Sequence, residues 1–168
     1  LMAQITKRKQ LNVSLKPLLV FYNEGKFLEA LKGVDKLLDT YPDFPMLFNI
    51  KGMILLSLNK FEESLIFYVK CLDQKETRLD ALLNLGVIYK KLGKFDKATK
   101  SYIDALKIDS NNVGALNNLG NLFNEKQDYN KAIQKLNEAI EASPGHIGAY
   151  NNLALAHKNN GDIEKAIK

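Results

Sequence analysis

The sequence predicts an all-α fold built from antiparallel helix pairs, and three observations support this expectation. Apolar residues recur at the helical period of 3.6 residues in two successive stretches of each repeat. Glycines such as Gly25, Gly93 and Gly161 separate the two stretches. The pattern recurs every 34 residues without a gap, which gives repeats over 11–44, 45–78, 79–112 and 113–146 and a partial repeat over 147–168.

Equivalent positions, counted from the first residue of each repeat, alternate between small and large side chains. Position 20 is small throughout, as Ala30, Ser64, Ala98, Ala132 and Ala166. Position 8 reads Leu18, Gly52, Gly86, Gly120 and Ala154. The large residues at position 24 are Val34, Tyr68, Tyr102 and Leu136, and those at position 17 are Phe27, Phe61, Phe95, Tyr129 and Ile163. We therefore expect positions 4, 7, 8 and 11 of the first helix to pack on the second helix, and successive pairs to stack.

The two ends of the array depart from the pattern. Pro17 stands at position 7, so the first helix should begin late or kink there. At the other end the sequence stops at Lys168, where Ile163, Ala166 and Ile167 would lack a covering neighbour. This end indicates an array that continues into a longer chain or packs on another molecule.

Repeat 79–112 carries the pattern most fully, in Leu85, Gly86, Tyr89, Gly93, Phe95, Ala98, Tyr102, Ala105 and Leu106. These L-G-x-x-Y, G-x-F, A-x-x-x-Y and A-L motifs at a spacing of 34 residues resemble the tetratricopeptide repeat family over residues 11–168. The pentatricopeptide RNA binders have a longer repeat, so this register argues against them. The resemblance implies a right-handed superhelical solenoid whose concave groove binds protein or peptide partners.

The basic residues are concentrated at the start of the chain. The net charge is +5, of which Lys7, Arg8 and Lys9 supply three charges within the basic N-terminal segment 1–10. The other 158 residues carry 21 basic and 19 acidic side chains. A nucleic-acid binder should show a basic stripe on its folded body, so we expect no nucleic-acid partner.

The apolar runs and the cysteine count bear on where in the cell the protein is expected. No apolar run approaches the roughly 20 residues that span a bilayer, so we expect no membrane span. The single cysteine, Cys71, rules out an internal disulfide and fits a reducing compartment. We therefore expect a cytoplasmic protein.

The face of the first helices opposite the core lines the groove, according to the family resemblance. Its C-terminal half is polar, with Asn84, Lys90, Asn117, Asn118, Asn121, Asn124, Asn151, Asn152 and Lys158. Asn84, Asn118 and Asn152 share position 6, and a column of amides can both donate to and accept from the backbone of an extended peptide. The resemblance adds the asparagine ladder of O-linked N-acetylglucosamine transferases, which Lys16 and Ile50 interrupt here. The alternative is that these asparagines are solvated helix residues.

The N-terminal half of the same face is apolar, with Leu15, Leu19, Tyr22, Met46, Ile50, Met53, Leu56, Leu83 and Val87. An exposed apolar patch of this size indicates a partner surface. Two alternatives stay open: segment 1–10 could fold back over the patch, or part of it could be core whose register shifts near Pro17. The chaperone-tail clamp of the family is not expected, because its lysine at position 5 is missing here.

No pattern in the sequence indicates a catalytic, cofactor or metal site. His157 stands at core position 11 and is expected to be a packed ring, while His146 lies in a loop. Cys71 occupies small position 27 and is expected to be a buried thiol. No histidine or cysteine cluster has metal-ligand spacing, and no glycine-rich phosphate loop is present. We expect neither a cofactor nor a metal, and no enzyme activity.

The leading hypothesis is therefore a non-catalytic protein-interaction scaffold that binds a partner segment in its groove. One alternative is the recognition arm of a larger glycosyl-, methyl- or sulfotransferase. Another is a scaffold that forms a homo-oligomer through its open C-terminal edge.

Overall fold

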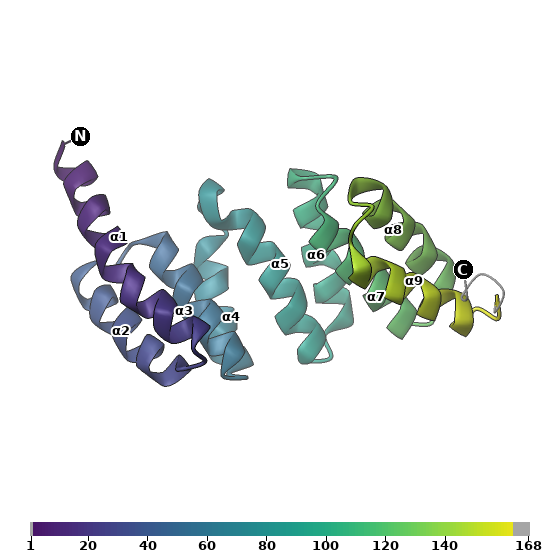
Figure 1. The fold of residues 1–168 in the computed structure, drawn as a ribbon, viewed down its shortest axis with the longest axis horizontal. Coiled ribbons are helices and arrows are strands. Elements are labelled where there is room, and N and C mark those ends of the chain that lie inside the picture. Colours follow the sequence, from purple (N-terminus) through teal and green to yellow (C-terminus); the bar gives the residue numbers. More distant parts are fainter. Residues whose placement is uncertain (1, 163–168) are drawn as a thin grey trace. The chain divides into compact units, whose positions relative to one another are not determined.

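The structure, a computed structural model, describes the backbone of residues 2–162 and the side chains of residue 11 and residues 13–162. The described helices follow one another without an intervening strand (Figure 1). They are α1 (Met2–Asn23), α2 (Phe27–Thr40), α3 (Pro45–Ser57), α4 (Phe61–Cys71), α5 (Lys75–Lys91), α6 (Phe95–Ile108), α7 (Val113–Glu125), α8 (Tyr129–Ala142) and α9 (Ile147–Asn159). The predicted all-α helical-repeat solenoid is confirmed. Ile163, Ala166 and Ile167 lie outside the described residues.

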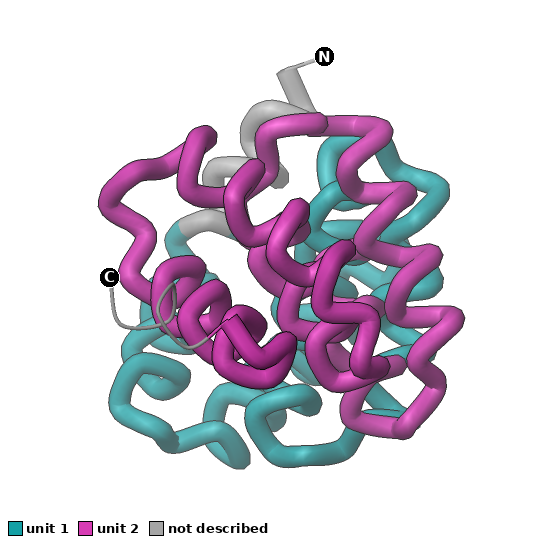
Figure 2. The backbone as a smooth tube through the Cα atoms, turned by 90° about the vertical axis from the view of Figure 1, so that its right-hand side faces the viewer, with its two compact units in different colours: residues 1–81 teal, residues 82–168 magenta. Residues whose placement is uncertain are grey.

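The chain divides into two compact units, residues 1–81 and 82–168 (Figure 2). Unit 1 contains α1 to α4 and the start of α5, and unit 2 contains the rest of α5 and α6 to α9. The repeat pattern predicts a single array over 11–168, whereas the unit boundary falls inside α5. Each unit is an antiparallel stack in its own right, with α1 on α2 and α3 on α4 in unit 1, and α7 on α8 and α9 in unit 2.

The two helices of each pair meet where a glycine faces a large side chain. A Cβ added to Gly52 would lie 2.9 Å from the Tyr68 ring, and one added to Gly120 would lie 2.6 Å from Leu136 Cγ. Gly86 stands in the same relation to Tyr102. Positions 8 and 24 are therefore in direct contact, and the side chains at position 24 are fully buried.

The turn between the helices of a pair is the same in every repeat. Position 15 is left-handed throughout, with φ between 58° and 88° at Gly25, Asn59, Gly93, Gln127 and Gly161. The backbone N–H of position 16 donates to the carbonyl of position 11 at 2.8–2.9 Å, which caps the first helix. The structure thus extends to all the repeats a turn that the glycine pattern predicted for three of them.

Helix α1 runs unbroken through Pro17, so the prediction of a late start is wrong. Pro17 and Val13 are both exposed, so the carbonyl of Val13 that loses its helical partner can bond water. Because the helix begins at Met2, the backbone of residues 2–10 forms its N-terminal part and does not fold back over the apolar face.

The first pair also changes register, which corrects the prediction for Leu15. Leu11, Leu15 and Leu18 follow one another at helical spacing and are all buried in the core of unit 1. Leu15 is 5% exposed and is a core residue rather than a groove residue. Here the large side chain lies on the first helix, since Leu18 packs against Gly33 of α2.

Helix α4 ends one turn earlier than the other second helices. It has 11 residues, whereas α2, α6 and α8 have 14 each. The terminal carbonyls are bound by the next helix: Thr77 Oγ1 donates to the carbonyl of Cys71 at 3.0 Å, and Arg78 Nε donates to that of Leu72 at 2.5 Å. The missing turn leaves a hollow beside α3 and the start of α5.

The close approach in the last complete pair predicts a large effect of added bulk. Replacing Gly120 with Val should lower the free energy of unfolding by about 2 kcal/mol, because the new side chain meets Leu136 and the Ala132 carbonyl. Urea unfolding monitored by circular dichroism measures the change. Gly145→Val is the control, since nothing lies within 4 Å of a Cβ at that position. Equal stability losses in the two variants would contradict the packing described here.

Candidate peptide-binding faces

In unit 2 the predicted polar residues gather on adjacent first helices. Helices α7 and α9 are in contact, and they carry the cluster that we call the amide face: Asn117, Asn118, Asn121, Asn151 and Asn152. Asn151 is exposed and the other four side chains are half-buried. The predicted groove residue Lys158 is also exposed on α9, and Asn84 is half-buried on α5.

The amides of neighbouring repeats bond to one another. Asn152 Nδ2 donates to Asn117 Oδ1 at 2.9 Å, and Asn159 Nδ2 donates to Asn124 Oδ1 at 3.1 Å. Each bond joins residues that are 35 apart, which is one more than the repeat length. The side chain at one position of a repeat therefore bonds to the side chain at the following position of the next repeat. Asn152 therefore serves packing between repeats, in addition to any contact with a partner.

Asn124 corrects the predicted groove. Its side chain is 8% exposed, so it is a buried polar residue rather than part of the amide face. The amide of Asn159 satisfies its oxygen, as a buried acceptor requires.

In other repeats, different residue types make the contact that Asn124 and Asn159 make. Lys90 Nζ lies 2.7 Å from Glu125 Oε1, again 35 residues away, and also donates to Asn121 Oδ1 at 3.2 Å. In unit 1, the hydroxyls of Tyr22 and Ser57 lie 2.9 Å apart at the corresponding positions. The predicted groove residues Lys90 and Tyr22 are thus partly engaged in contacts between repeats.

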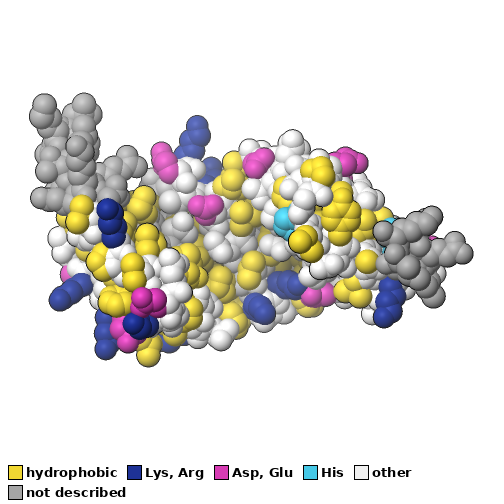
Figure 3. Space-filling model, in the orientation of Figure 1, with side chains coloured by type: hydrophobic (Ala, Val, Ile, Leu, Met, Phe, Trp, Pro, Cys, Tyr) yellow, Lys and Arg dark blue, Asp and Glu magenta, His cyan; other side chains and the backbone are white. Residues whose placement is uncertain are grey.

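Most of the predicted apolar residues are half-buried, as most of the polar ones are. In unit 1, Leu19 is 44% exposed, while Met53 and Leu56 are half-buried. Tyr22 and Ile50 are half-buried and pack against the core of that unit. Figure 3 shows hydrophobic side chains gathered over α1 to α3 on one face of this unit.

Two further predicted residues of the apolar half, Leu83 and Val87, belong to the part of α5 in unit 2. Both are half-buried there.

Groups with catalytic potential are placed as structural residues. Cys71 is buried, burial raises the pKa of its thiol, and the thiol therefore stays protonated at neutral pH. The half-buried His157 ring lies with Nδ1 3.5 Å from Asp162 Oδ2. His146, expected in a loop, is the N-cap of α9, and its Nδ1 accepts from the Ala149 N–H at 3.0 Å.

Among the side chains that the structure describes, residue 11 and residues 13–162, no group of three or more His, Cys, Asp or Glu could hold a metal ion. Over the same part of the chain, none of the helices combines the length and the apolar character needed to cross a bilayer.

The helix pairs of 34 residues, closed by a glycine facing a large side chain, define a tetratricopeptide repeat protein. Residues 13–164 match the family described as Psidin, N-terminal TPR repeats region, and the chain belongs to that family. No curated protein matches the sequence.

Solved structures share the fold at low sequence identity. MamA 41-end from Desulfovibrio magneticus RS-1 is 16% identical with a TM-score of 0.80, and the match covers 93% of this chain and 88% of that one. A tetratricopeptide repeat protein from Parabacteroides merdae ATCC 43184 is 22% identical with a TM-score of 0.78, covering 92% and 62% of the two chains. YrrB, described as a TPR protein with an unusual peptide-binding site, is 19% identical with a TM-score of 0.69, covering 96% and 86%.

The buried acceptor on Asn124 allows a test of the bonds between repeats. Asn159→Ala should lower the free energy of unfolding by about 1 kcal/mol, because Asn124 Oδ1 then loses its donor. Asn130→Ala on the exposed side of α8 should change it by less than about 0.5 kcal/mol. Chemical denaturation of both variants gives the comparison, and an Asn159→Ala variant as stable as the control would refute a structural role for this bond.

Proposed function

We propose that this chain is a non-catalytic protein-interaction scaffold, and that the amide face of unit 2 binds an extended segment of a partner protein. The supporting observation is the hydrogen-bonding capacity that the five amides retain. Asn118 and Asn151 make no hydrogen bond with another described side chain, and the bond between Asn152 and Asn117 uses only one donor and one acceptor.

An extended peptide presents backbone N–H and C=O groups in alternation along its length. Side-chain amides can pair with both kinds of group, whatever the sequence of the peptide. The bond between Asn117 and Asn152 restrains two of the amides before a partner arrives, which lowers the conformational entropy lost on binding. A rigid row of amides on packed helices is therefore suited to backbone recognition.

The apolar residues of unit 1 would provide a separate contact in this proposal. Leu19, Met53 and Leu56 keep part of their surface in solvent and could accept apolar side chains of a partner. YrrB has a similar fold and a peptide-binding site, which adds support for a peptide partner. The proposal includes a cytoplasmic location, supported by the one buried, unpaired cysteine.

A second candidate is the recognition arm of a larger transferase assembly. The fold also matches 23% of a longer chain in the structure of Naa15/Naa10 bound to HypK-THB, with a TM-score of 0.65 and 23% identity, which supports only that an array of this kind can be one part of a longer chain. A third candidate, homo-oligomerisation at the C-terminal edge, is supported by the exposed α9 residues Ile147, Tyr150 and Leu155.

The amide face can be tested without breaking a bond between repeats. A double variant, Asn118→Ala with Asn151→Ala, should weaken binding of a purified partner about tenfold, because two backbone contacts worth about 0.7 kcal/mol each are lost. The partner is first captured from a lysate with the wild-type chain, then measured by isothermal titration calorimetry.

The matched control is Asn130→Ala with Asn137→Ala, which removes two exposed asparagines of α8 and should leave the affinity unchanged. Equal affinities of wild type and the Asn118/Asn151 variant would exclude the amide face as the binding surface. Nuclear magnetic resonance spectra of both variants check that the fold is retained.

A further inference from the structure

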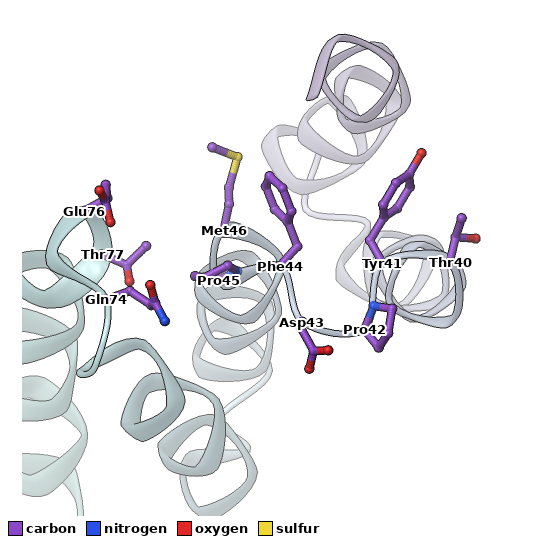
Figure 4. Close-up of a pocket in the computed structure, with 10 residues that line it drawn as sticks. All are labelled: Thr40, Tyr41, Pro42, Asp43, Phe44, Pro45, Met46, Gln74, Glu76 and Thr77. Atoms are coloured by element: carbon purple, nitrogen blue, oxygen red, sulfur yellow. The ribbon is translucent and has the colours of Figure 1, made fainter. Parts of the chain in front are cut away.

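A hollow lies at one end of the helices of unit 1. It has a volume of about 600 Å³ and is lined by three segments of the chain. Figure 4 shows the end of α2 with Thr40, Tyr41 and Pro42, the start of α3 with Phe44, Pro45 and Met46, and the turn into α5 with Gln74, Glu76 and Thr77. Asp43 completes the lining.

The hollow results from the short helix α4. Where α2, α6 and α8 continue for another turn, α4 ends at Cys71 and the chain turns at once into α5. Thr77 and Arg78 bind the terminal carbonyls of α4 and hold this geometry. The space is therefore bounded by helix ends and by the connection between α2 and α3, which supplies Tyr41, Pro42, Asp43 and Phe44.

The lining is apolar with two acidic groups. Tyr41, Phe44 and Met46 supply aromatic and thioether surface, and Met46 is 37% exposed. Asp43 and Glu76 are exposed, and neither forms a salt bridge with a described residue. Lysine and arginine are absent from the described lining, although the chain as a whole has a net charge of +5.

We propose that this hollow is a second peptide-binding site, specific for a segment that carries an arginine or lysine next to an apolar residue. It is distinct from the amide face and does not depend on it.

The chemistry of the lining selects this occupant. A guanidinium or ammonium group can lie over an aromatic ring, and the aliphatic stem of the same side chain can cover apolar surface. Figure 4 draws the carboxylates of Asp43 and Glu76 on different sides of Pro45, so a bound cation would pair with one of them. An acidic segment would instead meet like charges, and a purely apolar one would leave both carboxylates without a partner.

A selection with a random decapeptide library displayed on phage tests the proposal, with the full chain as the immobilised target. Selected sequences should be enriched in arginine or lysine beside an apolar residue. Their synthetic peptides should bind about tenfold more weakly to an Asp43→Asn, Glu76→Gln double variant in fluorescence anisotropy, because the charge pair is lost. High salt should also weaken their binding to the wild-type chain.

The control double variant, Glu29→Gln with Glu62→Gln, removes two exposed carboxylates from the first turns of α2 and α4 and should bind these peptides normally. The Asn118→Ala, Asn151→Ala variant should also bind them normally, which separates this site from the amide face. Failure to enrich basic peptides, or salt-independent binding, would overturn the proposal. Equal binding by the Asp43/Glu76 variant would overturn it as well.

Discussion

The contact between position 8 of a first helix and position 24 of the second determines how closely each pair can pack. With glycine at position 8, the side chain at position 24 lies against the backbone of the first helix. Tyr68, Tyr102 and Leu136 are all fully buried in this way. In the repeat that begins at residue 45, the small residue Ser64 adds a polar link, because its hydroxyl donates to the Gly52 carbonyl at 2.6 Å. Each pair thus buries one side of its first helix and leaves the other side for neighbours or partners.

That free side has two physical roles. Residues 35 apart bond from one repeat to the next, as in the pairs of Asn117 with Asn152 and Lys90 with Glu125. Between them, Asn118 and Asn151 keep their polar groups for other contacts. In the proposed function, the residues held by bonds between repeats would reduce the conformational entropy lost when a partner segment binds to the unpaired ones.

The stack of helix pairs follows from the sequence because each repeat carries the same pattern of small and large residues. The small residues at positions 8 and 20 lie where the two helices of a pair approach, as predicted, whereas the large ones at position 24 pack against position 8 within a pair as well as between pairs. Positions 3 and 10 were missed, although Ala81, Ile88, Ala115 and Leu122 are fully buried there. Their aliphatic character recurs in the later repeats and could have been noticed. The irregular parts could not be predicted from periodicity. The course of α1 through Pro17 depends on its exposure to solvent, and the early end of α4 depends on side chains that bind its carbonyls.

For the candidate site, too, periodicity accounts for only part of what the structure shows. Periodicity indicates which asparagines share a helix face. It does not indicate which side chain of a neighbouring repeat each amide hydrogen-bonds. It therefore placed Asn124 and Leu15 on the groove, whereas a neighbouring amide and a shifted register bury them. The hollow was not predicted as a site, although its lining residue Met46 stands on the predicted groove face and aromatic and proline residues recur over 41–46.

The contact between Gly86 and Tyr102 offers the most direct test of this account through a double-mutant cycle. Gly86→Val, Tyr102→Ala and the double variant are compared with wild type by urea unfolding. If valine occupies space that the tyrosine ring vacates, the double variant should be more stable than the sum of the single losses predicts, by about 1 kcal/mol or more. Strictly additive losses would contradict a direct contact between the two positions, and with it the packing that leaves the binding face free.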